Sequence, residues 1–309
     1  MTGTVGARSS PPGTPGLLVV DKDAGMTSHD VVARCRRLLD ERRVGHAGTL
    51  DPDATGVLLV GVGRATRLLR FLGAMGKSYV GEVVLGVATS TLDASGDVVG
   101  RWEMGDVDID EVRAAAATLT GTIEQLPPMV SAVKVAGRRL HVLARQGLDV
   151  PRPARAVTVE RFAVAPLPGS PDVVRIEVDC SSGTYVRVLA ADLGALLGGG
   201  AHLRNLRRTR IGSFTLSDAR RLPEIRPEHL LAPAQAVRDL PRLVVDGDVA
   251  GAVAHGRALD KTTLGASGGG PWAVVGAGGR LLAVYEGTAS NRMVAACVLE
   301  PAGAPGSDR

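Results

Sequence analysis

The segment from Gly45 to Gly56, GHAGTLDPDATG, constrains the fold of this chain more than any other part of the sequence. It places glycines, small hydroxyl side chains and Asp51 between two hydrophobic stretches. Asp51 precedes a proline, which favours extended backbone geometry, and the glycines permit turns that other residues resist. We therefore expect a buried loop that holds the carboxylate of Asp51 in a fixed place and leaves room for a flat ligand beside it.

Length, composition and charge narrow the class of protein. A chain of 309 residues that is 45% hydrophobic is typical of two domains and can bury a full core. Aromatic residues make up only 3%, which argues against a single-strand binder built on rows of stacking aromatics. The net charge of +4 suits a nucleic-acid partner without requiring one. The basic residues concentrate at 34–37, 134–155 and 204–210.

The cysteines and the N-terminal segment indicate a cytoplasmic protein. Cys35, Cys180 and Cys297 lie far apart, without zinc-site or Cys-x-x-Cys spacing, which is typical of reduced thiols. Residues 1–16 are polar and rich in Gly, Pro and Ser, so we expect a disordered tail rather than a signal peptide. No apolar run is long enough to cross a membrane.

Hydrophobic periodicity predicts the secondary structure. Apolar or alternating runs predict strands at 17–22, 57–63, 77–85, 157–164 and 173–180. Helical spacing predicts helices at 31–43, 64–72, 108–119 and 185–197, and Thr27 and Asp30 have the spacing of a capping box before the first. Prolines interrupt the pattern at 221–241, and short apolar stretches at 242–245, 272–275 and 281–285 predict a small β-rich domain after them.

Further blocks follow the Asp51 segment in a fixed order. They are KSY at 77–79, QLPPMVSAVK at 125–134, RRL through ARQG at 138–147, CSSGTYVR at 180–187 and HLRNLRR at 202–208. Together with GHAGTLDPDATG, these blocks resemble those of the TruB-type tRNA pseudouridine synthases over residues 17 to about 222. Val130 departs from the pattern, because many relatives carry tyrosine there.

The resemblance implies a fold and an activity. The fold is α+β: a pseudouridine-synthase catalytic domain with a mixed, mainly antiparallel sheet at 17–230, which includes a mobile RNA-binding insertion at 127–155, and a PUA-like RNA-binding domain at 240–302. The activity is isomerisation of the uridine at position 55 of tRNA, in the T-arm loop, to pseudouridine. The base flips out, its N1–C1′ bond breaks, and the uracil rejoins through C5. Because the reaction involves neither redox change nor net hydrolysis, it requires no cofactor and no metal.

The same resemblance assigns catalytic roles to Asp51, Tyr79 and Arg187. Asp51 is the essential carboxylate, and the sequence leaves open whether it attacks C6 of the base or C1′ of the sugar. A carboxylate in a dry pocket tends to become neutral, and a bidentate guanidinium from Arg187 would keep it ionised. Tyr79 would stack on the uracil and move a proton late in the reaction. The simpler alternatives are a turn-capping aspartate, a surface arginine and a half-buried strand tyrosine.

The resemblance also implies residues that contact the RNA. His46 would occupy the space left by the extruded base. The other expected substrate contacts are Gly48, Thr49, Leu206, Lys134, Arg138, Arg139 and Arg145. The basic residues among them lie in the insertion, although most such charge runs are simply solvated faces.

The expected partner is the tRNA T-arm stem-loop, bound by a monomer with no obligate protein partner and no membrane. Two other functions remain open from the sequence. One is a related synthase that is guided by a ribonucleoprotein, and the other is a non-catalytic factor that refolds the same stem-loop.

Overall fold

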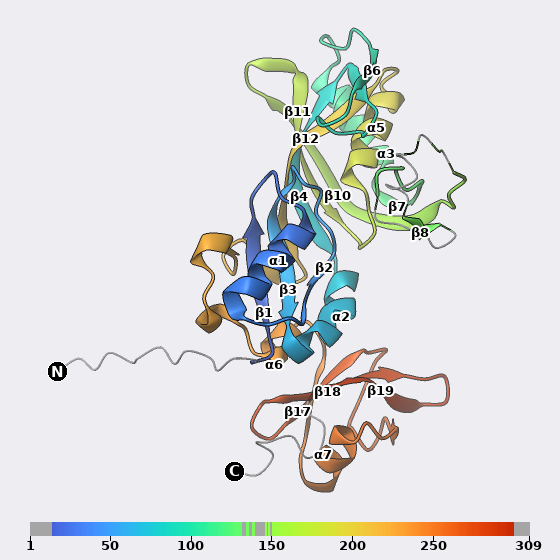
Figure 1. The fold of residues 1–309 in the computed structure, drawn as a ribbon. Helices are drawn as coiled ribbons and strands as arrows, with labels where there is room; N and C mark the ends of the chain where they lie inside the picture. Colours follow the sequence, from blue (N-terminus) through green and yellow to red (C-terminus); the bar gives the residue numbers. More distant parts are fainter. Residues whose placement is uncertain are drawn as a thin grey trace, which may run out of the picture.

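The computed structural model describes residues 14–131, 134–135, 138–139, 146, 148 and 150–299. A ten-stranded sheet with helices packed against it is followed by a separate five-stranded sheet at the C-terminal end of the described chain (Figure 1). This confirms the predicted α+β class, with a mixed, mainly antiparallel sheet and a small β-rich unit after it. Within these residues, no helix is long and apolar enough to span a bilayer.

The strand order of the large sheet is β14-β1-β3-β12-β4-β11-β10-β7, with β2 added on β3 and β13 on β12. All pairs are antiparallel except β1–β14 and β3–β12, which are parallel. The strands are β1 (Gly16–Lys22), β2 (Val44–Ala47), β3 (Thr55–Val62), β4 (Lys77–Leu85), β7 (Gly121–Gln125), β10 (Arg155–Leu167), β11 (Ser170–Cys180), β12 (Ala201–Ile211), β13 (Phe214–Thr215) and β14 (Arg220–Arg221).

Strand β12 joins the two halves of the sheet, because it pairs with β4 on one side and with the start of β3 on the other. The contact with β3 is very close. Gly56 has a φ of +101°, and a Cβ there would lie 2.1 Å from the carbonyl oxygen of Arg208, so only glycine fits. The loop that carries Asp51 leads directly into this crossing point.

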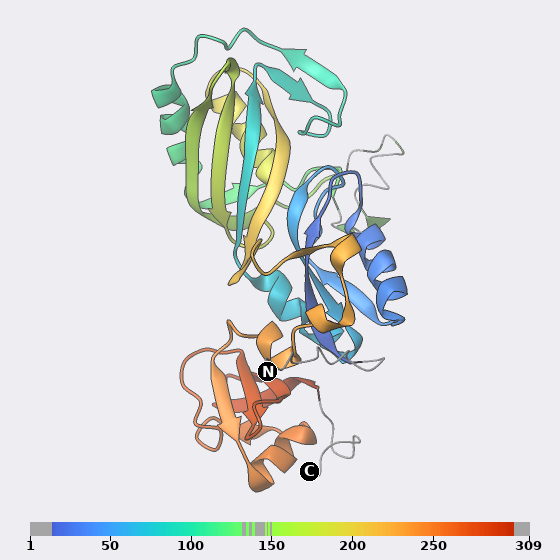
Figure 2. The ribbon, with the colours of Figure 1, turned by 90° about the vertical axis from the view of Figure 1, so that its left-hand side faces the viewer.

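Among the described residues, the longer helices that pack on the large sheet are α1 (Ser28–Leu39), α3 (Ile109–Thr118) and α5 (Val186–Leu196). Helix α1 packs Val31, Val32 and Cys35 on β1 and β3. Thr27 and Asp30 form the predicted capping box, but the helix ends at Leu39 rather than at residue 43, because Asp40 turns left-handed with a φ of +47°. Helices α3 and α5 pack on the long strands β4, β10, β11 and β12 (Figure 2).

Shorter elements connect these parts. The predicted helix at 64–72 is a 3₁₀ turn, η1 (Gly63–Leu68), followed by α2 (Leu69–Ala74). A hairpin of β5 (Val87–Thr89) and β6 (Val98–Arg101) follows β4, and β8 (Lys134–Val135) pairs with β9 (Arg138–Arg139). The segment before the small sheet contains η2 (Leu222–Glu224), η3 (Pro227–His229) and α6 (Pro233–Ala236).

The C-terminal sheet has the order β15-β17-β18-β19-β16 and carries one helix, α7 (Gly247–Ala254). Its strands are β15 (Arg242–Val245), β16 (Leu259–Asp260), β17 (Trp272–Gly276), β18 (Leu281–Gly287) and β19 (Arg292–Val298). Val275, Leu281 and Val284 from this sheet share one apolar core with Phe71 and Phe214 of the larger part. The two sheets are therefore joined by buried side chains as well as by the chain.

Replacing Phe214 with alanine should lower the free energy of unfolding by about 3–5 kcal/mol, because the ring is fully buried in this shared core. Val244→Ala is the control, since Val244 is 68% exposed and should change stability little. Denaturant unfolding followed by circular dichroism measures both variants. Equal stabilities for the two variants would contradict a shared core.

Candidate active site

The loop between β2 and β3 carries Asp51, and a buried arginine of the neighbouring strand β12 binds its backbone. Arg208 on β12 is only 1% exposed, and its Nε donates to the carbonyl of Val57 at 2.7 Å. Its two terminal nitrogens donate to the carbonyls of Thr49 and Gly48, each at 3.3 Å. The backbone of the predicted loop is therefore fixed to the central strand. The sequence had assigned no role to Arg208.

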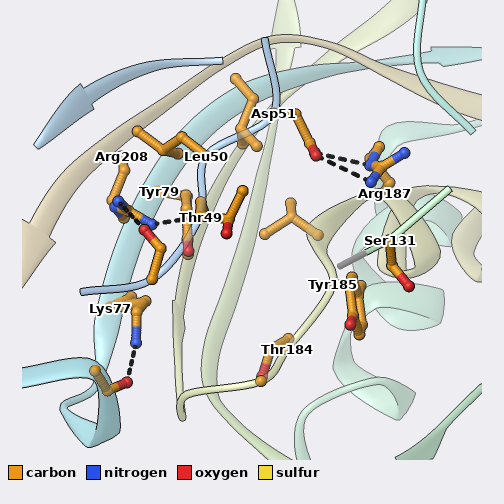
Figure 3. A pocket seen from close by; sticks show the side chains of 15 residues that line it. Thr49, Leu50, Asp51, Lys77, Tyr79, Ser131, Thr184, Tyr185, Arg187 and Arg208 are labelled. Carbon is orange, nitrogen blue, oxygen red and sulfur yellow. Dashed lines mark hydrogen bonds and ion pairs between the residues drawn. The ribbon is translucent and has the colours of Figure 1, made fainter. Parts of the chain in front are cut away.

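The carboxylate of Asp51 meets the guanidinium of Arg187 through two nitrogens (Figure 3). Nε of Arg187 lies 2.9 Å from Oδ2, and a terminal nitrogen donates to Oδ1 at 3.1 Å. Arg187 stands in the first turn of α5, just after Tyr185 at the start of that helix. The predicted bidentate pair is present, and such a pair fixes both oxygens of the carboxylate.

Arg187 itself has little freedom to move, because it is 4% exposed and its remaining donors are also engaged. They reach the carbonyls of Thr91 at 2.9 Å and Val130 at 3.0 Å. The carboxylate of Asp93, in the β5–β6 hairpin, lies 3.3 Å from the same guanidinium. Arg187 thus stands between two carboxylates, of which the sequence had indicated only Asp51.

Burial and charge act in opposite directions on Asp51. Loss of water around the carboxyl group raises its pKa above the usual value, and the neighbouring Arg187 opposes that rise. Although 39% of the side chain is exposed, it borders two cavities, so this exposure is to recessed space. The arginine therefore favours the ionised form that the surroundings disfavour.

A cavity of about 390 Å³ opens beside Asp51. It lies within the range of roughly 300–1,000 Å³ that suits a small ligand. Tyr79 lines it and is 8% exposed, and burial raises the pKa of its hydroxyl, which keeps it protonated at neutral pH. Thr184 and Tyr185 face Tyr79 across the space (Figure 3). Of the predicted substrate contacts, three also line this cavity: Gly48, Thr49 and Leu206.

His46 lies next to the cavity rather than in its lining. It sits on β2, and its ring meets His29 edge-on, with 5.4 Å between the ring centroids. Burial lowers the pKa of His46, and His29 and Arg208 lower it further, so the ring is neutral at pH 7.

The predicted basic contacts are only partly described. Lys134 and Arg139 are paired residues of the β8–β9 hairpin, and Arg138 pairs with Val135. Arg145 lies outside the described residues.

Lys77 is a further cavity residue to which the sequence assigned no role. Its ammonium donates to the carbonyls of Gly73 at 3.0 Å and Met75 at 2.8 Å. Burial lowers the pKa of this ammonium to about 8. Within the described part of the chain, no group of three or more His, Cys, Asp or Glu is placed to hold a metal ion. What the site offers is an oriented carboxylate, a neutral phenol and a recess of suitable size for a planar ring.

Comparison with known protein families gives two matches along the chain. Residues 36–186 match the family described as TruB family pseudouridylate synthase (N terminal domain). Residues 187–255 match the tRNA pseudouridylate synthase B C-terminal domain.

Individual proteins agree with the family matches. The chain is 53% identical to a tRNA pseudouridine synthase B of Rhodococcus jostii over 251 residues, which is 79% of this chain and 82% of that protein. It is 48% identical to the protein of the same name from Mycolicibacterium paratuberculosis over 93% of this chain and 98% of that one. Among solved structures, a Cbf5-Nop10-Gar1 complex contains a chain with a TM-score of 0.71 and 27% identity, covering 96% of this chain and 92% of that one.

Replacing Arg187 with methionine should raise the pKa of Asp51 further, because the guanidinium is the largest influence that opposes burial. The carboxyl carbon shift of Asp51, followed by NMR over a pH titration, measures the change. Arg161→Met is the matched control, since Arg161 pairs with Glu177 on the long strands. If the pKa of Asp51 were the same in both variants, the guanidinium would not be what keeps the carboxylate ionised.

Proposed function

The chain belongs to the TruB family of pseudouridylate synthases, and we propose on that premise that it isomerises uridine 55 in the T-arm loop of tRNA to pseudouridine. One observation carries the proposal for the site. The carboxylate of Asp51 is held by two nitrogens of Arg187 at the edge of a cavity of about 390 Å³. A cavity of this size accepts a single base that has left its stack, and the carboxylate would stand beside the bond between that base and its sugar.

In the proposed reaction, Asp51 acts in its ionised form. The N1–C1′ bond breaks, the uracil turns, a C5–C1′ bond forms, C5 loses its proton, and N1 ends protonated. The carboxylate serves either as a nucleophile at C6 of the base or as a nucleophile at C1′ of the sugar. In both cases Arg187 orients the two oxygens and keeps the negative charge available in a site poor in water.

Tyr79 fits the second half of this reaction. Its ring lies along the cavity wall, where it would pack against the face of the uracil. Its hydroxyl is protonated at neutral pH because burial raises its pKa. We therefore assign it the stacking of the base and a part in moving the C5 proton.

The same proposal assigns different roles to different parts of the chain. Residues 17–230 would carry the chemistry, with the stretch 127–155 closing over the RNA and His46 entering the space that the base leaves. Residues 240–302 would form a PUA-like domain that adds RNA contacts. The protein would act alone as a monomer.

One experiment separates this proposal from its two rivals. Purified protein is incubated with an unmodified tRNA transcript that carries tritium at C5 of uridine, and release of tritium is followed. Release without any added protein or guide RNA supports the proposal, and loss of release from a transcript with cytidine at position 55 locates the base. A guided synthase would need further components, and a folding factor would release no tritium.

Replacing Asp51 with asparagine should abolish tritium release and leave RNA affinity within a few-fold, because the shape is kept and the charged oxygen is lost. Filter binding and single-turnover kinetics measure the two quantities. Asp106→Asn removes an exposed carboxylate that does not line the cavity and serves as the control. An Asp51→Asn protein that still forms pseudouridine would refute the role of the carboxylate.

Replacing Arg138 and Arg139 together with alanine should weaken RNA binding and flatten its dependence on salt. Each lost phosphate contact reduces the log–log slope by roughly 0.7–0.9, so the pair should reduce it by on the order of 1.5. Affinity measured over a series of salt concentrations checks this. An unchanged affinity with an unchanged slope would leave these arginines as a solvated face.

A further inference from the structure

Ser28 makes an unusual pair of contacts with the loop that carries Asp51. It is the first residue of α1 and is only 1% exposed. Its hydroxyl accepts a hydrogen bond from the backbone nitrogen of Leu50 at 2.9 Å and donates one to the carbonyl oxygen of the same residue at 3.2 Å. Leu50 is the residue immediately before Asp51. The side chain of Ser28 therefore binds both the backbone nitrogen and the carbonyl oxygen of the residue next to the catalytic candidate.

These contacts satisfy the hydrogen-bonding groups of a buried part of the loop. Leu50 lies between β2 and β3, outside the sheet ladder, and is 3% exposed, so water cannot reach its backbone groups freely. Buried backbone groups without partners are costly, and a hydroxyl can donate and accept at once. Thr27 and Asp30 bond to each other in the exposed capping box at the start of α1, whereas Ser28 points to Leu50.

The other side of Asp51 is held by the same short segment of chain. The ammonium of Lys22 donates to the carbonyl of Pro52 at 2.8 Å, and the backbone nitrogen of Gly25 donates to the same oxygen at 3.0 Å. The segment from the end of β1 to the start of α1 therefore forms hydrogen bonds with the residue before Asp51 and with the residue after it. These bonds on both sides restrict the backbone of Asp51.

These contacts with the loop affect the geometry of the ion pair between Asp51 and Arg187. The carbonyls of Thr91 and Val130 hold the guanidinium of Arg187 by contacts that do not involve the loop. The two contacts of 2.9 Å and 3.1 Å to Asp51 then depend on where the loop places it. A shift of about 1 Å at a reacting group can cost on the order of 100-fold in rate.

We propose that Ser28 is a positioning residue for the rearrangement: through Leu50, its hydroxyl sets the place of the Asp51 carboxylate against Arg187. The proposal rests on the proposed function for its kinetic consequence, and on the geometry of the loop alone for its effect on Asp51. Ser28 lines neither of the two cavities beside Asp51, so in this proposal it acts through the backbone of Leu50.

The kinetic test compares Ser28→Ala with Thr27→Ala. Both substitutions remove a hydroxyl from the start of α1, but only the first removes the contacts to Leu50. Ser28→Ala should slow the single-turnover rate by on the order of 10- to 100-fold and leave the RNA dissociation constant within about threefold. Thr27→Ala weakens the helix cap and should lower thermal stability with little effect on the rate. Equal rates for the two variants would overturn the proposal.

Conservative variants keep the test valid if the alanine protein folds poorly. Ser28→Cys keeps the shape of the side chain with a slightly larger atom and offers only a weak donor and acceptor, and Ser28→Thr preserves the hydroxyl. The proposal expects rates in the order serine, then cysteine, then alanine, with threonine above cysteine. A cysteine variant that is as fast as wild type would overturn it, because a hydroxyl would then be dispensable.

A pH profile separates positioning from general destabilisation. Burial raises the pKa of Asp51 and Arg187 opposes the rise, so a looser ion pair should raise that pKa further. The acid limb of the single-turnover rate should therefore move to higher pH in Ser28→Ala and stay in place in Thr27→Ala. An acid limb that does not move would assign Ser28 a merely structural role.

The carboxyl carbon shift of Asp51 gives the same answer without RNA. If wild-type protein released no tritium, the proposed function would fail, yet an NMR titration of Asp51 in wild type and Ser28→Ala would still decide whether Ser28 positions the carboxylate. A pKa that is unchanged by the substitution would refute that positioning, whatever the activity.

Discussion

The ion pair between Asp51 and Arg187 joins the loop after β2 to the first turn of α5, across 136 positions of the chain. Burial disfavours the charge on the carboxylate, and the guanidinium of Arg187 offsets that cost more than any other neighbouring group does. The ion pair therefore keeps the carboxylate charged only if both side chains are held in place. Much of the surrounding structure supplies that restraint: carbonyls of the β5–β6 hairpin and of residue 130 hold the arginine, and the segment from Lys22 to Ser28 holds the loop.

Strand β12 supplies the second restraint, because it crosses the start of β3 where the loop ends. The crossing works only with glycine at position 56, and it places the buried Arg208 under the carbonyls of Gly48 and Thr49. A fully buried arginine is tolerated here because its donors meet the backbone oxygens of Val57, Thr49 and Gly48. The same residue lies beside Tyr79 and His46, where its charge acts on the pKa of each.

Sequence alone predicted the elements whose burial pattern is simple. Residues 77–85 alternate buried and half-buried positions, and the predicted strand has the same bounds as β4. Strand β12 was missed, because its arginines hide the alternation and only the structure shows that Arg208 points inward. Helix α1 was predicted too long, since its basic periodicity continues past the left-handed turn at Asp40. The resemblance to a family brought Asp51, Tyr79 and Arg187 together. From the sequence, Ser28 could be interpreted only as part of the start of a helix, because the residue to which it bonds is 22 positions away.

The C-terminal sheet reaches the site through α2. Val275 and Leu281 pack in one core with Phe71 and Phe214, and Arg70 pairs with Glu286 at 2.8 Å. Gly73 in the last turn of α2 and Met75 just after it hold the ammonium of Lys77 at the cavity wall through their carbonyls. Loss of the small sheet would expose the apolar face of α2 to water and remove the support of this wall. Two sheets that share a core in this way cannot be varied independently, because a change in how the small sheet packs is also a change in the shape of the pocket.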